Sequence, residues 1–123
     1  IRVDGSAARP PSQLGEEPAH DWCFYYQKAG LALQQGDWQK IASLGQQAEQ
    51  AGLHWNAPAE LLPFIEGYAR GGDLQKAQAL TAEAGQDAGM RPSLCAAWQK
   101  IGQQDGDLGA VSAAVQSDLG CAP

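Results

Sequence analysis

Few residues in this chain of 123 have side chains that commonly react or bind metals. There are three cysteines, Cys23, Cys95 and Cys121, and two histidines, His20 and His54. No two cysteines have the spacing of a CxxC motif, and the histidines lie far apart, so the usual ligand pattern of a zinc site is missing. The sequence therefore predicts no metal site and no cofactor. We expect Cys23 to be a small buried residue.

The acidic residues do not form a recognisable catalytic set either. Asp37, Asp73 and Asp107 each follow a glycine at a turn, where capping of the next helix explains them. Residues 71–74 (Gly-Gly-Asp-Leu) do not resemble a phosphate-binding loop, because no strand precedes them and no Gly-Lys-Ser/Thr follows. We predict that the chain is not an enzyme, the alternative being a small helical hydrolase or transferase with an unrecognised site.

Charge and composition restrict the class of protein further. The net charge is −6, so nucleic acid is a poor candidate partner. Hydrophobic residues make up 44%, enough for a folded core, yet no apolar run is long enough to cross a membrane. Because the chain begins at Ile1 without a methionine, we expect it to be a piece of a longer protein.

The elements that position these residues are predicted to be helices. Threonine occurs once and valine three times, and this shortage of β-branched residues argues against a sheet. Apolar residues recur at steps of three and four, which predicts six helices, over about 21–35, 38–51, 56–70, 74–84, 91–105 and 108–119. Asn56 is expected to cap the third, in which Pro63 requires a kink or a later start. Residues 1–19, rich in Pro and Gly, are expected to form an extended arm or linker.

Three similar turns divide the helices into pairs. Gly36-Asp37-Trp38, Gly72-Asp73-Leu74 and Gly106-Asp107-Leu108 are spaced by roughly 35 residues, a period typical of helix-pair repeats. The middle unit also has large, aromatic and small residues in the order Leu61, Tyr68, Ala77 and Ala84. On these residues, positions 20–123 resemble a degenerate array of tetratricopeptide repeats. The resemblance implies a right-handed stack of antiparallel helix pairs, with a plain six-helix bundle as the alternative.

Register within such a stack predicts a binding surface. The first helix of each pair would line a concave face. Eight residues of these first helices are expected to lie on that face: Tyr26, Leu33, Gln34, Leu62, Glu66, Arg70, Lys100 and Gln104. Aromatic rings beside a few charges suit a peptide or protein segment, with a glycan as a further option. The alternative for Glu66 and Arg70 is a simple pair on the helix surface.

A second resemblance concerns three longer strings. Residues 36–40 (GDWQK), 58–70 (PAELLPFIEGYAR) and 91–98 (RPSLCAAW) are similar to the soluble C-terminal domain that follows the membrane spans of bacterial glycosyltransferases of the protein-mannosyltransferase type. The resemblance implies an extracytoplasmic, non-catalytic interaction domain, tethered to a membrane protein of glycosyl transfer or envelope biogenesis. The alternative is a cytosolic tetratricopeptide-type adaptor that binds a peptide in its groove.

The two later cysteines bear on this choice. Cys95 lies in the first turn of the fifth predicted helix and Cys121 just after the sixth, so an antiparallel pair would bring them together. A disulfide there would stabilise the last helix pair and agree with an extracytoplasmic location. Two free thiols in a reducing cytosol are the alternative.

Overall fold

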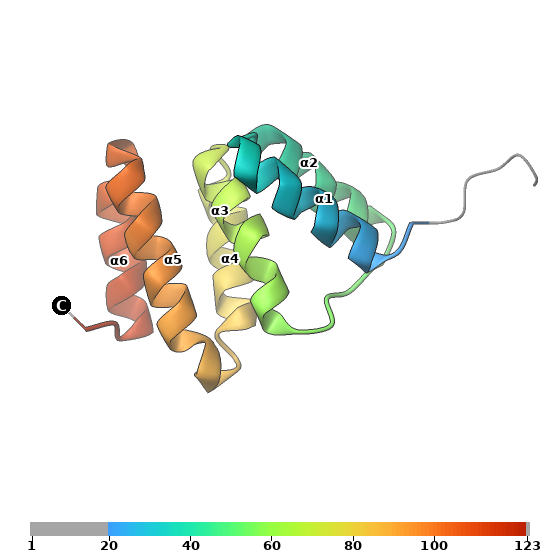
Figure 1. Cartoon of the computed structure of the whole chain (residues 1–123). Coiled ribbons are helices and arrows are strands. Elements are labelled where there is room, and N and C mark those ends of the chain that lie inside the picture. Colours follow the sequence, from blue (N-terminus) through green and yellow to red (C-terminus); the bar gives the residue numbers. More distant parts are fainter. Residues whose placement is uncertain (1–19, 123) are drawn as a thin grey trace, which may run out of the picture.

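The computed structural model describes residues 20–122, and in this range the chain is all-α, as predicted. The expected arm at 1–19 lies outside the described residues. Figure 1 shows the helices packed as neighbouring pairs along the chain. The helices are α1 (Trp22–Gln35), α2 (Trp38–Gln50), α3 (Leu62–Arg70), α4 (Leu74–Ala84), α5 (Arg91–Gln104) and α6 (Gly109–Leu119), with short 3-10 turns η1 (Pro58–Leu61), η2 (Ala88–Met90) and η3 (Gly106–Leu108).

The first two Gly-Asp turns have the predicted geometry. Gly36 ends α1 with a φ of 69°, in the left-handed region that glycine tolerates best. The Asp37 carboxylate then accepts a hydrogen bond of 3.2 Å from the backbone N–H of Lys40. Asp73 makes the same contact, 3.1 Å long, with the N–H of Lys76. Two reversals of the chain are thus fixed by residues within a few positions of the turn.

The third turn is different, and the expected role of Asp107 as a cap is wrong. Asp105 is the capping residue here, because its carboxylate accepts from the backbone N–H of Asp107 at 3.2 Å. The chain then makes the turn η3 before α6 begins at Gly109. The similarity of the three sequences therefore does not extend to a common backbone geometry.

The third helix starts at Leu62, later than Asn56. This later start is one of the two outcomes expected from Pro63, the other being a kink. The turn η1 comes first, and Pro63 then falls in the first turn of α3, where its missing N–H costs no helical hydrogen bond. Asn56 does not cap the helix. The Glu60 carboxylate instead accepts from the backbone N–H groups of Asn56 (2.8 Å) and Ala57 (3.2 Å) and from the indole of Trp22 (2.8 Å).

The core runs between the pairs and is centred on α3. Helices α1, α2, α4 and α5 all contact it, and α5 also packs on α6. The approach of α2 to α3 is very close, because a Cβ added at Gly67 would lie 2.2 Å from Cγ2 of Ile41. The largest fully buried side chains are Trp98, Tyr68, Phe64, Ile41, Ile65, Leu94 and Ile101.

The cysteines divide into a bonded pair and a single thiol. Cys95 and Cys121 form a disulfide with their Cα atoms 5.8 Å apart, which joins the start of α5 to the end of α6 (Figure 1). The expectation that Cys23 is buried is wrong, because its side chain is exposed on α1. Among residues 20–122, no helix is both long and apolar enough to span a bilayer.

Candidate functional site

A shallow groove lies between α1, α3 and α5. Its volume is about 380 Å³, and the lining side chains are mainly apolar. Leu33 comes from α1, and Leu62 and Pro63 from the first turn of α3. The remaining lining residues are Glu66 on α3 and Ser93, Ala96, Ala97 and Lys100 on α5. The first helices of the three pairs therefore all contribute to one surface.

A buried carboxylate is part of this surface. The Glu66 side chain is only 8% exposed, yet both of its oxygens are paired. Oε1 lies 3.0 Å from Nζ of Lys100 on α5, and Oε2 lies 3.1 Å from Nη1 of Arg70 one turn further along α3. Such burial is tolerated because each negative oxygen meets a positive group. The Glu66–Lys100 ion pair joins α3 to α5 beside the groove.

Arg70 extends the polar network to α2 and to a second residue of α5. Its guanidinium lies over the Trp38 ring on α2, with Cζ 4.1 Å from the ring centroid, a distance typical of a cation–π contact. Nη1 also donates a hydrogen bond of 2.7 Å to Oε1 of Gln104 on α5. One side chain thus connects the turn into α2 with the ends of α3 and α5.

The structure brings together six of the eight residues predicted for the binding face. Leu33, Leu62, Glu66 and Lys100 line the groove, and Arg70 and Gln104 adjoin it through the polar network. The other two, the half-buried Tyr26 and the exposed Gln34 on α1, do not line it. Glu66 and Arg70 do pair, but the Glu66 carboxylate is buried and Arg70 is only partly exposed. Trp22 and Tyr25 belong to the core.

Lys100→Glu is expected to lower the free energy of unfolding by about 1–3 kcal/mol. Although Lys100 is half exposed, the substitution places a second carboxylate beside the buried oxygen of Glu66. Urea unfolding followed by circular dichroism measures the effect. The exposed Lys40 on α2 provides the control, since Lys40→Glu should change stability by less than about 0.5 kcal/mol. Equal effects at the two positions would contradict the buried network.

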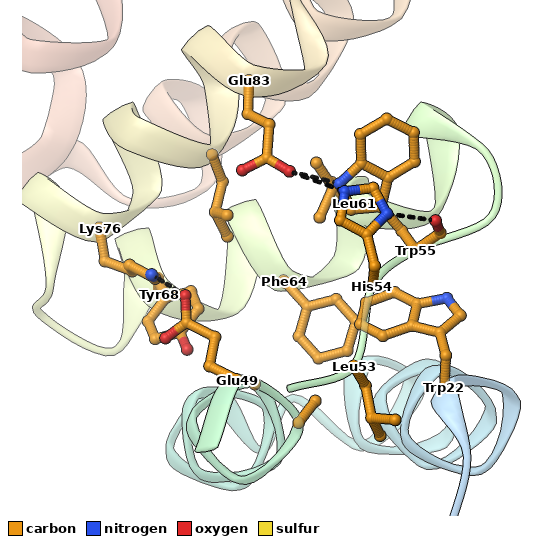
Figure 2. Close-up of a pocket in the computed structure, with 13 residues that line it drawn as sticks. Trp22, Glu49, Leu53, His54, Trp55, Leu61, Phe64, Tyr68, Lys76 and Glu83 are labelled. Atoms are coloured by element: carbon orange, nitrogen blue, oxygen red, sulfur yellow. Dashed lines mark hydrogen bonds and ion pairs between the residues drawn. The ribbon is translucent and has the colours of Figure 1, made fainter. Parts of the chain in front are cut away.

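A second cavity, of about 170 Å³, opens on another side of α3 (Figure 2). Four aromatic rings line it, from Trp22 on α1, Trp55 in the loop after α2, and Phe64 and Tyr68 on α3. Figure 2 shows Glu49, Lys76 and Tyr68 together at one end and His54, Trp55 and Glu83 at the other. The other lining residues are Gly45, Ala48, Leu53, Leu61 and Leu80.

The Tyr68 hydroxyl is the unusual group in this cavity. The residue is 1% exposed, and its oxygen has no hydrogen-bond partner. It fits against α2 only because Gly45 lacks a side chain, since a Cβ there would lie 2.5 Å from Oη. Burial, together with the charges of Glu49 and Asp73, raises the pKa of Tyr68 to about 12, so the hydroxyl stays protonated.

The loop between α2 and η1 is held over the cavity by side-chain contacts. The Trp55 indole donates to the Glu83 carboxylate on α4, and Nδ1 of His54 lies 2.7 Å from the Trp55 carbonyl oxygen, to which it donates. Nε2 of His54 is 4.0 Å from Glu83. At the far end of the loop, the Trp22–Glu60 hydrogen bond fixes η1 to α1. The cavity wall is therefore anchored at both ends.

The anchor at Glu60 is expected to weaken in acid. Burial raises the pKa of Glu60, but the hydrogen bonds from Asn56, Ala57 and Trp22 outweigh it, so the pKa lies below the ordinary value of 4.5. Because the pKa of this carboxyl is lower in the folded than in the unfolded chain, the carboxylate stabilises the fold at pH values above its unfolded-state pKa. This contribution is lost as the pH falls through its folded-state pKa. The difference in unfolding free energy between the wild type and Glu60→Gln should therefore shrink from pH 7 towards about pH 3. Urea titrations at several pH values test this, and a difference that is constant with pH would contradict it.

Sequence reasoning did not find this second cavity. The predicted helices, 38–51 and 56–70, leave His54 and Trp55 in a loop, which is correct. Tyr68, the aromatic residue of the middle repeat unit, belongs to the core. The available signal was a glycine at position 45 within a helical pattern, which marks a close approach by another side chain. The partner of that glycine is Tyr68, and only the packed structure shows this.

Residues 20–122 contain no group of three or more His, Cys, Asp or Glu side chains placed to hold a metal ion. Comparison of the chain with models of known protein families, with curated proteins and with solved structures finds no match. The geometry of the groove and of the aromatic cavity is therefore the basis for interpreting function.

Proposed function

We propose that this chain is a non-catalytic interaction domain, built as a degenerate tetratricopeptide-like stack, that binds a peptide segment of another protein in the groove between α1, α3 and α5. The observation that carries the proposal is the groove itself, because the first helix of each pair contributes to its lining. The contacts of α3 with both α1 and α5 also agree with such a stack. In solenoids of this kind, the equivalent surface is the usual binding face.

The chemistry of the groove indicates what kind of segment would bind. Its floor of Leu33, Leu62, Pro63, Ala96 and Ala97 suits small or branched apolar side chains. The Glu66 carboxylate is already neutralised by two cations, so the network of Glu66, Arg70 and Lys100 has a net positive charge. Lys100 is half exposed and accessible to a ligand. The best partner is an apolar segment with one acidic residue that reaches Lys100.

The proposed location is the extracytoplasmic side of a bacterial membrane, where the domain would be tethered to a protein of glycosyl transfer or envelope biogenesis. The Cys95–Cys121 disulfide supports a compartment outside the reducing cytosol. The resemblance of residues 36–40, 58–70 and 91–98 to the membrane glycosyltransferases supports the tether. A cytosolic peptide-binding adaptor is the competing function, and the redox state of these cysteines in the native host distinguishes the two.

Selection from a displayed library of random ten-residue peptides tests the groove. The library is selected in parallel on the wild type and on Ala96→Arg, in which a long side chain fills the groove from an exposed position on α5. We expect the wild type to enrich apolar peptides with one Asp or Glu, and Ala96→Arg to lose them. Lys100→Gln should reduce the preference for the acidic residue.

The matched control is Ala79→Arg, which adds the same side chain at an exposed alanine of α4. Its selected peptides should equal those of the wild type. Enrichment of the same peptides on Ala96→Arg, or no enrichment on any of the proteins, would contradict binding in the groove.

A further inference from the structure

Helix α1 contains a glycine, Gly30, that its neighbours do not explain. A Cβ added at this position would meet nothing within 4 Å among residues 20–122, and the backbone there is ordinary α-helix. A glycine inside a helix destabilises it relative to alanine, because glycine loses more conformational freedom on folding. The missing side chain therefore brings no benefit to the packing that the structure describes.

The other glycines within the described helices differ from Gly30. Gly45, Gly67 and Gly102 each lie so close to another side chain that an added Cβ would come within 3.0 Å of it. Gly109 has open space, but it is the first residue of α6, at the junction with η3. A reason for glycine in the middle of α1 must therefore be sought in something that binds there.

Gly30 lies on the side of α1 that faces the groove. Residues three and four positions apart share one face of a helix, so Tyr26, Gly30 and Leu33 form a continuous line, which we name the α1 line. Leu33 lines the groove, and both Tyr26 and Leu33 are partly buried against the core. At about 1.5 Å per residue, the α1 line extends the groove by roughly 10 Å towards the start of α1.

The α1 line suits the main chain of an extended peptide. Glycine is the residue that lets another backbone approach most closely. One turn after Gly30, the exposed Gln34 side-chain amide offers both a donor and an acceptor. An extended peptide has N–H and C=O groups free to pair with this amide, whereas those of a helical peptide are largely paired already.

The distances along this surface favour the same conformation. An extended chain of ten residues spans up to about 33 Å, while a helix of ten residues is only about 15 Å long. A helix that covered the α1 line would have little length left for the groove. An extended chain can lie along the α1 line, cross the groove and still place an acidic residue at Lys100, the half-exposed cation of the groove.

We propose that the peptide bound in the groove continues along α1 as an extended chain, with its main chain against Gly30, a side chain against the Tyr26 ring and its acidic residue at Lys100. This path rests on the proposed function and adds the conformation of the bound peptide and the part of α1 that it covers.

Substitutions at Gly30 test the path. The probe is the ten-residue peptide most enriched on the wild type, synthesised with a fluorescein label and titrated by fluorescence anisotropy. Gly30→Leu places a side chain in the open space and is expected to weaken binding at least about tenfold, with a smaller loss for Gly30→Ala. Both variants should unfold at the same or a higher urea concentration than the wild type, because leucine and alanine favour helix more than glycine and meet nothing here. Weaker binding by a protein of undiminished stability separates a contact with the peptide from a folding defect.

Matched variants locate the effect on the α1 line. Gly109→Leu makes the same change at another helical position with open space, on a helix that does not line the groove, and should bind the probe as the wild type does. Tyr26→Ala is expected to weaken binding about fivefold. Its control is Phe24→Ala, which removes another partly buried ring of α1, away from the α1 line, and should leave binding unchanged.

A constrained probe tests the extended conformation. The same peptide held as a helix by a side-chain lactam is expected to bind more weakly than the linear probe, because its main chain cannot lie along Gly30 and reach the groove. Tighter binding by the helical form would overturn the proposed path, since a ligand fixed in its bound conformation binds better.

The outcomes for the path and for the groove can be told apart. If Ala96→Arg abolishes binding of the probe while Gly30→Leu binds it as the wild type does, the groove is retained and the path along α1 is overturned. If Gly30→Leu loses binding and Ala96→Arg does not, the peptide lies on α1 alone, and both proposals are rejected. Enrichment of no peptide on the wild type would likewise contradict both.

Discussion

Replacing Trp98 by alanine is expected to lower the free energy of unfolding by about 3–5 kcal/mol, because it leaves a large cavity in the core. Trp98 is fully buried on α5 and joins three helices. Its indole Nε1 donates a hydrogen bond of 2.9 Å to Oγ1 of Thr81 on α4, and its carbonyl accepts one from the Ser112 hydroxyl on α6. The substitution therefore removes packing and also leaves the Thr81 hydroxyl without its donor.

Urea unfolding followed by far-ultraviolet circular dichroism measures this loss. Trp98→Phe keeps most of the ring volume but not the N–H, so its loss should be smaller than that of alanine. Leu31 is the matched control, since it is half exposed on α1, and Leu31→Ala should cost less than about 0.5 kcal/mol. A cost at Trp98 similar to the cost at Leu31 would mean that the third helix pair does not pack as described.

Removing the disulfide is the change with the second-largest expected effect. A double substitution, Cys95→Ser with Cys121→Ser, should lower the free energy of unfolding by about 3–4 kcal/mol on the chain-entropy account. The bond joins residues 26 apart, and the helices it connects, α5 and α6, are the last pair of the described chain. Comparison of the oxidised wild type with the double variant in urea measures the effect, and Cys23→Ser, at an exposed free thiol, is the control.

The same bond makes the proposed location testable in the native host. Protein isolated without reductant and then denatured should contain one free thiol per chain, that of Cys23, and a cross-linked peptide with Cys95 and Cys121. Three free thiols would contradict the extracytoplasmic location and favour the cytosolic adaptor. Equal stability of the reduced and oxidised proteins would show that the bond contributes nothing to the last helix pair.

The helices could be predicted from the sequence because their signals are local. Apolar residues at steps of three and four mark the buried faces, and Gly36, Asp37 and Asp73 end or begin helices through contacts within a few residues. The turn at 106–108 shows where this reasoning stops. It has the same Gly-Asp pair, but Asp105 lies one residue before that pair. The Asp105 carboxylate, and not that of Asp107, accepts the capping hydrogen bond.

The functional surfaces were predictable only in part, since they depend on contacts between distant residues. The positions of Glu66, Arg70 and Lys100 within the first helices of their repeat units predicted that they share one face. In the structure the three side chains do meet. Their mutual pairing and the burial of Glu66 depend on how closely α5 packs on α3, which the pattern of one helix does not show. The aromatic cavity depends on still more distant contacts, such as that between the loop residue Trp55 and Glu83 on α4.

The close approaches at Gly67 and Gly45 have a consequence for evolutionary variation. Neither position has room for a methyl group while its partner, Ile41 or Tyr68, keeps its present size. Homologous chains that retain this packing should therefore show correlated substitutions, in which a larger residue at 45 accompanies a residue without a hydroxyl at 68. Gly67 should change only together with a smaller residue at 41. These two covarying pairs form a signature that could identify distant members of the lineage after the turn sequences have diverged.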